Sequence, residues 1–292
     1  MICLGFIFQK ISDERSSEPF IARLTLGMLE LRDHALRCKY NDSEYEKARL
    51  SFDGAYTPIL NGMQAIRKAT KTIFQLLTEH QQKVISGKIV SFQNKVLILD
   101  KSIDSQLNEQ VAAFLTNGVI ALKGTQKITE MFGINIGCFF AKQSNFEKGI
   151  SELKQNGENS LAQYLQDVRA SWSENFINRR NSLEHDGWSL PSVEYNVKSI
   201  TNVEIVEPQI DGIGLSKYIQ ITLNRIILYI ENIILYSFKS VLWPQIMIIE
   251  ISEEKQDSES PVKFQVTLRN PELNEWDLKY YETDSFFKGL SS

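Results

Sequence analysis

Residues 160–188 read SLAQYLQDVRASWSENFINRRNSLEHDGW, and this stretch does most to decide the fold. Apolar side chains recur through it at helical spacing, at Leu161, Tyr164, Leu165, Val168, Trp172, Phe176 and Leu183. The spacing collects them on one face, so we predict an amphipathic α-helix that begins near Ser160. Gly187 and Pro191 predict its end, because glycine favours the left-handed turn after a helix and proline cannot continue it.

The last turns of this helix concentrate side chains that bind phosphate or move protons: Arg179, Arg180, Asn181, Glu184 and His185. Residues four apart share a helix face, so Arg180 lies with Glu184, and Asn181 lies with His185. Arg180 and His185 diverge by roughly 140° on an ideal helix. They can meet at one phosphate only if the helix end unwinds near Gly187 or if a second chain supplies the partner.

The residue types in this cluster indicate phosphodiester chemistry. A guanidinium binds phosphate bidentately and stays charged, and an imidazole takes up and returns a proton at neutral pH. Asn181 could hold a phosphate oxygen or fix a tautomer, and Glu184 would favour protonated His185 if the two are close. Arginine and histidine without a metal-ligand cluster suit RNA cleavage by transphosphorylation, in which the 2′-hydroxyl attacks the adjacent phosphate.

Residues 180–185, Arg-Asn-Ser-Leu-Glu-His, resemble the R-N-x-x-x-H form of the signature of the HEPN domain family. These helical nucleotide-binding domains occur in prokaryotic toxins, abortive-infection proteins and RNA-targeting CRISPR effectors. The form with asparagine after arginine arises by chance in roughly one such sequence in a hundred. Residues 184–188, with Leu190, Pro191 and Tyr195 downstream, are similar to a branch of stand-alone bacterial HEPN proteins.

The resemblance implies a metal-independent endoribonuclease that cleaves single-stranded RNA and needs no cofactor, as in a toxin or an anti-phage defence effector. It implies that Arg180 and His185 form the catalytic pair and that Asn181 polarises or positions the reacting groups. It also implies a homodimer with a composite active site, and an antitoxin or regulator as a possible partner. Candidate substrate-binding residues are Arg179, Glu184, Tyr195, Asn224 and Arg225, the last two because they interrupt an otherwise apolar helix.

Two other interpretations stay open. A non-catalytic HEPN-like module would bind a nucleotide or a protein through the same residues without turnover. In an unrelated helical scaffold, Arg180 and Glu184 would be a surface ion pair worth a few tenths of a kcal/mol, and His185 would cap the helix end.

Composition sets the wider bounds. The chain has 292 residues, 42% of them hydrophobic and 23% charged, which predicts a globular protein with a real core. A net charge of -4 argues against a surface built for tight, non-specific nucleic-acid binding. Cys3, Cys38 and Cys138 lack metal-ligand spacing and indicate reduced thiols in a cytoplasmic protein. The most apolar stretch, residues 213–249, is interrupted by charged residues. We therefore predict that it forms a core helix and not a membrane span.

We therefore expect a mainly α fold, a HEPN-like helical bundle with small β-hairpin additions. Further helices are expected over residues 17–31, 58–84, 105–131, 146–153 and 215–242. Residues 1–8 suggest a buried edge segment, and residues 89–98 fit either a strand or a helix start. A β-hairpin or an extended flap is expected over residues 193–206, and a small hairpin over residues 245–269. The expected domains are an N-terminal helical region (1–104), the bundle with the motif (105–242) and a C-terminal hairpin extension (243–292).

Overall fold

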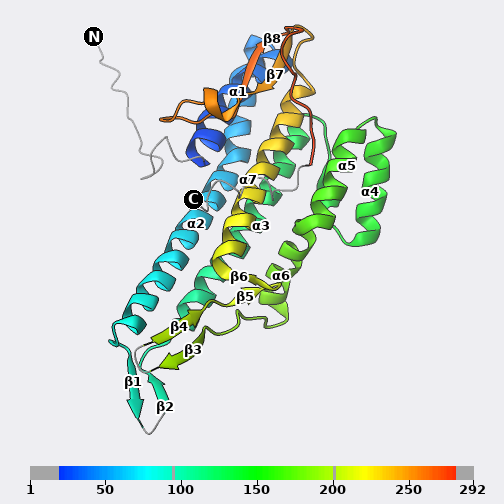
Figure 1. Cartoon of the computed structure of the whole chain (residues 1–292). Helices are drawn as coiled ribbons and strands as arrows, with labels where there is room; N and C mark the ends of the chain where they lie inside the picture. The colour runs from blue at the N-terminus through cyan, green and yellow to red at the C-terminus, as the bar shows by residue number, and fades with distance from the viewer. Residues whose placement is uncertain (1–19, 94–95, 200–201, 281–292) are drawn as a thin grey trace, which may run out of the picture. The chain divides into compact units, whose positions relative to one another are not determined.

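The computed structural model describes residues 20–93, 96–199 and 202–280. This part of the chain is mainly α-helical with short two-stranded antiparallel hairpins, which confirms the expected fold class (Figure 1). The expected edge segment at residues 1–8 and the expected helix start at residues 17–19 lie outside the described residues.

The helical elements follow the apolar spacing of the sequence. They are η1 (Ile21–Gly27), α1 (Met28–Lys39), α2 (Asp42–Ile85), α3 (Asp104–Met131), η2 (Gly137–Phe140), α4 (Gln143–Gln155), α5 (Asn159–Val168), η3 (Arg169–Ser173), α6 (Glu174–His185), α7 (Leu215–Lys239) and η4 (Glu253–Lys255). The helix expected from residue 160 is confirmed as the run of α5, the π-helical turn η3, and α6.

The strands pair only with their neighbours in the sequence. They are β1 (Val90–Gln93) with β2 (Val96–Leu99), β3 (Glu194–Ser199) with β4 (Asn202–Val206), β5 (Gln209–Ile210) with β6 (Ile213–Gly214), and β7 (Ile246–Glu250) with β8 (Phe264–Leu268). Both expected hairpins are confirmed, and the ambiguous region contributes the paired strands β1 and β2, at residues 90–93 and 96–99.

The predicted start of the second helix was wrong. We expected it at Pro58, but α2 begins at Asp42 and carries Pro58 in its interior. The side-chain oxygen of Asn41 accepts hydrogen bonds from the backbone N–H groups of Ser43 and Glu44, at 3.1 and 3.2 Å. This is the arrangement of a helix N-cap, so the helix begins at a good capping residue and not at the proline.

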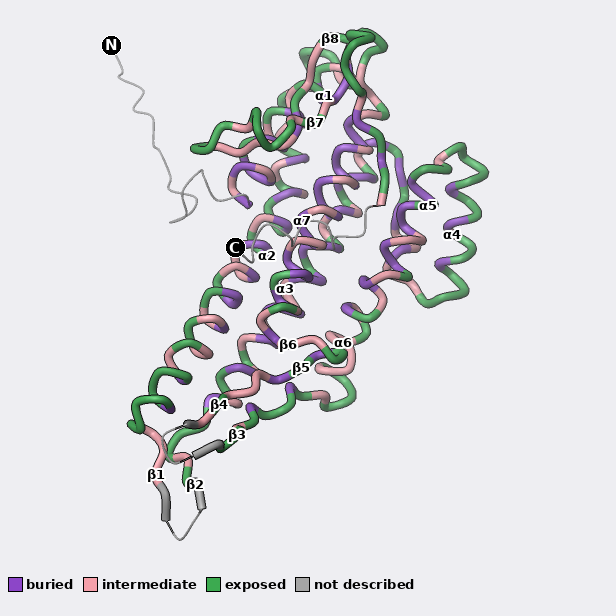
Figure 2. Tube along the Cα trace, viewed as in Figure 1, coloured by how far each residue is buried: buried purple, intermediate pink, exposed green. Residues whose placement is uncertain are grey.

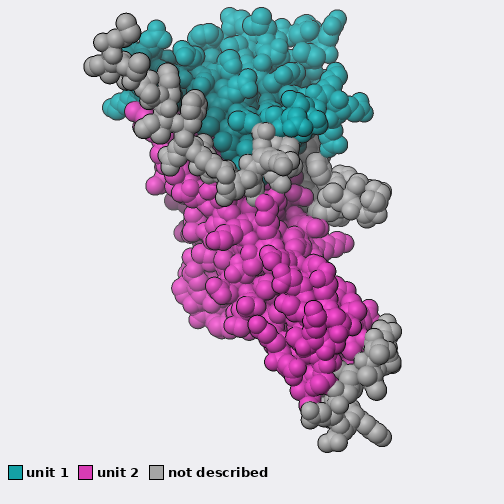
Figure 3. Space-filling model, turned by 90° about the vertical axis from the view of Figure 1, so that its left-hand side faces the viewer, with its two compact units in different colours: residues 1–49, 238–277 teal, residues 50–237, 278–292 magenta. Residues whose placement is uncertain are grey.

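The chain divides into two compact units, coloured separately in Figure 3. Unit 1 comprises Met1–Arg49 and Phe238–Asp277, and unit 2 comprises Leu50–Ser237 and Leu278–Ser292. Both units are discontinuous in sequence, whereas the sequence suggested three consecutive segments. Those segments stay a prediction about domains.

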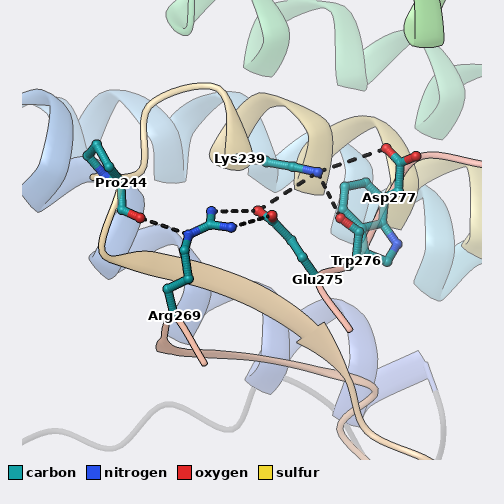
Figure 4. A network of polar contacts seen from close by, with 6 residues as sticks. All are labelled: Lys239, Pro244, Arg269, Glu275, Trp276 and Asp277. Carbon is teal, nitrogen blue, oxygen red and sulfur yellow. Dashed lines mark hydrogen bonds and ion pairs between the residues drawn. The ribbon is translucent and has the colours of Figure 1, made fainter. Parts of the chain in front are cut away.

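Unit 1 is closed at its C-terminal side by a network of charged side chains (Figure 4). Arg269 donates from Nε to the carbonyl of Pro244 at 2.8 Å and from both Nη atoms to the carboxylate of Glu275 at 2.9 and 3.2 Å. Lys239 donates to the carbonyl of Trp276 at 2.9 Å and lies 3.9 Å from the Glu275 carboxylate. The network ties the end of α7 to the segment that follows β8.

In unit 2, a close approach between α3 and α6 fixes the helix that carries the motif. A Cβ on Gly118 of α3 would lie 2.5 Å from the ring of Phe176 on α6, so only glycine allows this packing. Phe176 also meets the rings of Phe114 and Trp172, at centroid distances of 6.3 and 6.0 Å. The buried aromatic side of α6 is thereby anchored, and its polar end is left at the surface.

The apolar helix α7 belongs to the core, and buried residues run along α3 and α7 in Figure 2. Among the described residues, α7 alone is long and apolar enough to cross a membrane, and 67% of its most apolar window is buried within the chain. That burial is expected of a core helix.

Candidate functional site

Helix α6 ends as the sequence predicted. Gly187 has a left-handed backbone with φ of 68°, and the backbone N–H of Trp188 donates to the carbonyl of Ser182 at 3.1 Å. The same carbonyl accepts from the N–H of Asp186 at 2.9 Å. The turn satisfies a carbonyl at the helix end and places the predicted motif on the last turns before the chain reverses.

The motif residues form a chain of contacts centred on Glu184. The Arg180 guanidinium lies 2.7 Å from one oxygen of Glu184, and His185 Nε2 lies 3.9 Å from the other. Arg180 also donates to the side-chain oxygen of Asn181 at 3.2 Å. The side chain of His185 is 71% exposed, whereas that of Arg180 is only 23% exposed. Glu184 thus holds the arginine in place, and the histidine faces solvent.

The backbone stays helical through His185, so unwinding does not bring Arg180 and His185 onto one face. Their Cβ directions differ by about 140° on an ideal helix, but their side chains converge, because Arg180 lies 2.7 Å and His185 Nε2 3.9 Å from the two oxygens of the Glu184 carboxylate. The two groups therefore come close to one carboxylate within a single chain, and the homodimer stays a prediction.

Arg179 occupies a separate environment. Its guanidinium pairs with the carboxylate of Asp211 and lies 4.9 Å from the centre of the Trp188 ring. The Nε atoms of Arg179 and Arg180 are both buried and have no hydrogen-bond partner among the described residues. Each guanidinium therefore keeps a donor that the folded chain does not satisfy, which is uncommon for buried nitrogen atoms.

Tyr195 is not in hydrogen-bond contact with the α6 cluster. Its hydroxyl lies 2.6 Å from Nε2 of His80, a histidine near the end of α2 that is 2% exposed. Burial lowers the pKa of His80, partly opposed by Asp104, and burial together with Asp104 raises the pKa of Tyr195 to about 12. Both side chains are therefore neutral at pH 7. A role for Tyr195 in binding substrate stays a prediction.

The first turn of α3 holds the segment that follows α6. The side-chain oxygens of Asn108 and Asp104 accept hydrogen bonds from the backbone N–H groups of Leu190 and Val193, each at 2.9 Å. Together with the His80–Tyr195 contact, they fix residues 190–195 against α2 and α3. The chain leaving the motif is therefore firmly placed.

Asn224 and Arg225 are half-buried on α7. The charges of Arg179 and Arg225 both act to lower the pKa of Tyr218, which burial and the Asp211 charge raise to about 12. Asp211 and His80 were missed by the sequence reasoning. Asp211-Gly212 between two isoleucines is a strong signal for a two-residue hairpin turn and could have revealed Asp211. His80 carries no comparable signal.

Among the described residues, no group of three or more His, Cys, Asp or Glu side chains is arranged to hold a metal ion. No protein-family model, curated protein or solved structure matches the chain.

Proposed function

We propose that the chain is a metal-independent endoribonuclease of the HEPN type that cleaves single-stranded RNA in the cytoplasm. The observation that carries the proposal is the end of α6, where half-buried Arg180 has an unsatisfied Nε and exposed His185 closes the helix. A half-buried guanidinium with an unpaired donor, beside an exposed imidazole that can carry a proton, suits phosphodiester cleavage. In the cell, such an activity would serve a toxin or an anti-phage defence effector under an antitoxin or regulator.

The proposed reaction needs only side chains of the motif. Neutral His185 takes the proton of the 2′-hydroxyl, whose oxygen then attacks the adjacent phosphorus. The bond from phosphorus to the 5′-oxygen breaks, and a protonated His185 from a second copy gives that oxygen a proton. The products are a 2′,3′-cyclic phosphate and a 5′-hydroxyl. Arg180 binds the non-bridging oxygens, whose charge grows in the transition state, and Asn181 orients them.

A homodimer is part of the proposal because the reaction uses one histidine as base and another as acid, and each copy supplies only one from the motif. Within one copy, Arg180 and His185 both lie near the Glu184 carboxylate. Two α6 ends brought together would add the second histidine. Glu184 would then hold Arg180 until RNA replaces it.

The test is cleavage of a mixed-sequence single-stranded RNA in the presence of EDTA. Wild type is compared with Arg180→Ala and His185→Ala, and with Lys148→Ala, which removes an exposed cation on α4. We expect wild type and the control variant to cleave and to leave cyclic-phosphate ends, and both motif variants to be inactive. Thermal melts establish that every variant is folded.

Two results would count against the proposal. Cleavage by His185→Ala at the wild-type rate would remove the histidine from the mechanism. No cleavage by a folded, dimeric wild type would favour a non-catalytic module, which retains nucleotide binding that depends on Arg180.

A further inference from the structure

Beside the motif, a second arginine is held by an internal anion. The Arg179 guanidinium pairs with the Asp211 carboxylate, and the Trp188 ring lies against it with a centroid distance of 4.9 Å. The Asp211 side chain is 42% exposed, so solvent and ligands reach the carboxylate side of this pair. An exposed ion pair contributes little to folding, about 0–1 kcal/mol, and is readily exchanged for another anion.

The turn that carries Asp211 is built to direct this carboxylate. Asp211 and Gly212 form the two-residue connection between β5 and β6, and both have left-handed backbones, with φ of 54° and 77°. This is the pattern of a type I′ hairpin, in which aspartate or asparagine followed by glycine is strongly preferred. Asparagine could replace Asp211 without disturbing the turn, which provides a clean variant.

The charges of Asp211, Arg179 and Arg225 all act on the hydroxyl of Tyr218, which lies on α7. Tyr218 and Arg225 are seven residues apart on α7, so they share one face of the helix. Burial, followed by the Asp211 charge, raises the pKa of Tyr218 to about 12, whereas the charges of Arg179 and Arg225 act to lower it.

We propose that Arg179 and Trp188 form a phosphate-binding subsite for single-stranded nucleic acid, and that Asp211 occupies it until a phosphodiester displaces the carboxylate. The planar guanidinium fork accepts a carboxylate or a phosphate in the same bidentate geometry. Arginine beside aromatic rings is a common arrangement in proteins that bind single strands. The subsite extends the proposed ribonuclease site along the strand, so its biological meaning rests on the proposed function.

Binding is measured separately from cleavage by using a fluorescent single-stranded oligodeoxynucleotide, which lacks the 2′-hydroxyl and stays intact. Fluorescence anisotropy compares the full-length wild type with Asp211→Asn, Arg179→Gln and the double variant. We expect Asp211→Asn to tighten binding about twofold to fivefold by removing the competing charge. Arg179→Gln should weaken binding and make the slope of log affinity against log salt shallower by about 0.7.

The double variant and a charge control decide the outcome. In the Arg179→Gln background, Asp211→Asn should have no more effect than Glu147→Gln, which removes an exposed negative charge on α4. Three results would overturn the subsite. Asp211→Asn could raise the affinity equally with and without Arg179, or it could raise the affinity no more than Glu147→Gln does. The third is that wild type shows no measurable binding.

RNA cleavage by the same variants separates this proposal from the proposed function. A wild type that binds the oligodeoxynucleotide with the expected response to Asp211→Asn but never cuts RNA supports the subsite and contradicts the nuclease. A wild type that cuts RNA while its binding ignores Arg179 and Asp211 supports the nuclease and contradicts the subsite.

Discussion

The arginines at the end of α6 and the arginine after β8 differ in how fully the fold uses them. Arg269 in unit 1 donates from all three guanidinium nitrogens, to the Pro244 carbonyl and twice to Glu275 (Figure 4). In unit 2, Arg179 and Arg180 each pair with one carboxylate and keep a buried Nε without a partner among the described residues. The first arrangement uses every guanidinium nitrogen within the fold, and the second leaves one donor that the described residues do not use.

This difference also separates the structural interpretation of the motif from the functional one. An arginine retained only for stability gains most when every donor is paired, because an unmade hydrogen bond on a buried donor costs about 1–3 kcal/mol. Arg269 has a partner for every guanidinium nitrogen, whereas the Nε of Arg180 has none among the described residues. The comparison therefore favours a ligand at α6 and a structural role at Arg269, and four experiments can break or sharpen it.

The largest expected effect is that Arg180→Ala loses activity but not stability, whereas Arg269→Ala loses stability but not activity. Arg180→Ala should lower RNA cleavage by about a hundredfold or more, because a cation that stabilises transition-state charge contributes on that scale. Its melting temperature should barely change, since an exposed i,i+4 pair contributes a few tenths of a kcal/mol. Arg269→Ala should retain cleavage and melt earlier. Equal losses of activity in the two variants would refute the distinction.

The second effect concerns only the network of Arg269, Glu275 and Lys239, in which Arg269 uses all its donors. Glu275→Gln should lower the free energy of unfolding by about 1 kcal/mol, because it replaces a bidentate ion pair and removes the carboxylate near Lys239. Glu272→Gln, an exposed residue close by in sequence, is the matched control. Urea denaturation of both variants measures the difference, and indistinguishable curves would show that the network does not stabilise the fold.

The third effect is a pH dependence that arises where the chain leaves α6. The pKa of buried His80 is lowered by burial and the Lys83 charge, against the opposing Asp104 charge, and Tyr195 contacts the imidazole. Below about pH 6.5 the unfolded chain therefore binds a proton that folded His80 resists. Stability is full above that pH and declines as the pH falls towards the lowered value.

Denaturation curves between pH 5 and pH 8 check this prediction. The fall in stability on acidification should be steeper for wild type than for His80→Gln, which has no imidazole to titrate. His34→Gln serves as the control because it removes a different histidine, on α1. If His80→Gln has the same pH profile as wild type, His80 is not the group responsible.

The smallest expected effect comes from the carboxylate that holds the motif arginine. Glu184→Gln should change the free energy of unfolding by less than about 0.5 kcal/mol, since the pair with Arg180 is partly exposed. It should tighten binding of a single-stranded oligodeoxynucleotide, because Arg180 loses its competing anion. Weaker binding would mean that Glu184 contacts the ligand favourably, as the sequence first suggested.

Local patterns in the sequence predicted much of the fold. The spacing from Leu161 to Leu183 predicted the helix that carries the motif, and Gly187 predicted its end. The start of α2 was missed because Pro58 usually begins a helix. Buried Phe52, Tyr56 and Ile59 form one stripe that continues past the proline, and this packing outweighs the local preference.

The site was predictable only where its residues are neighbours in the sequence. Arg180, Asn181, Glu184 and His185 lie on consecutive turns, so helix geometry alone gave the contact of Arg180 with Glu184. It left open whether His185 approaches Glu184, and the structure places the two side chains 3.9 Å apart. The pairing of Arg179 with Asp211 spans 32 residues, and that of His80 with Tyr195 spans 115. Such contacts depend on how helices and hairpins pack, which a single sequence does not reveal.

The most direct test of the central claim is nuclear magnetic resonance of the arginine Nε–H groups in arginine-labelled protein. Each signal is assigned by an Arg→Lys variant, and an uncleavable single-stranded oligodeoxynucleotide is then titrated in. The account predicts that the Arg179 and Arg180 signals shift as the ligand saturates, while the Arg269 signal stays in place. Binding that leaves the Arg179 and Arg180 signals unchanged would contradict it.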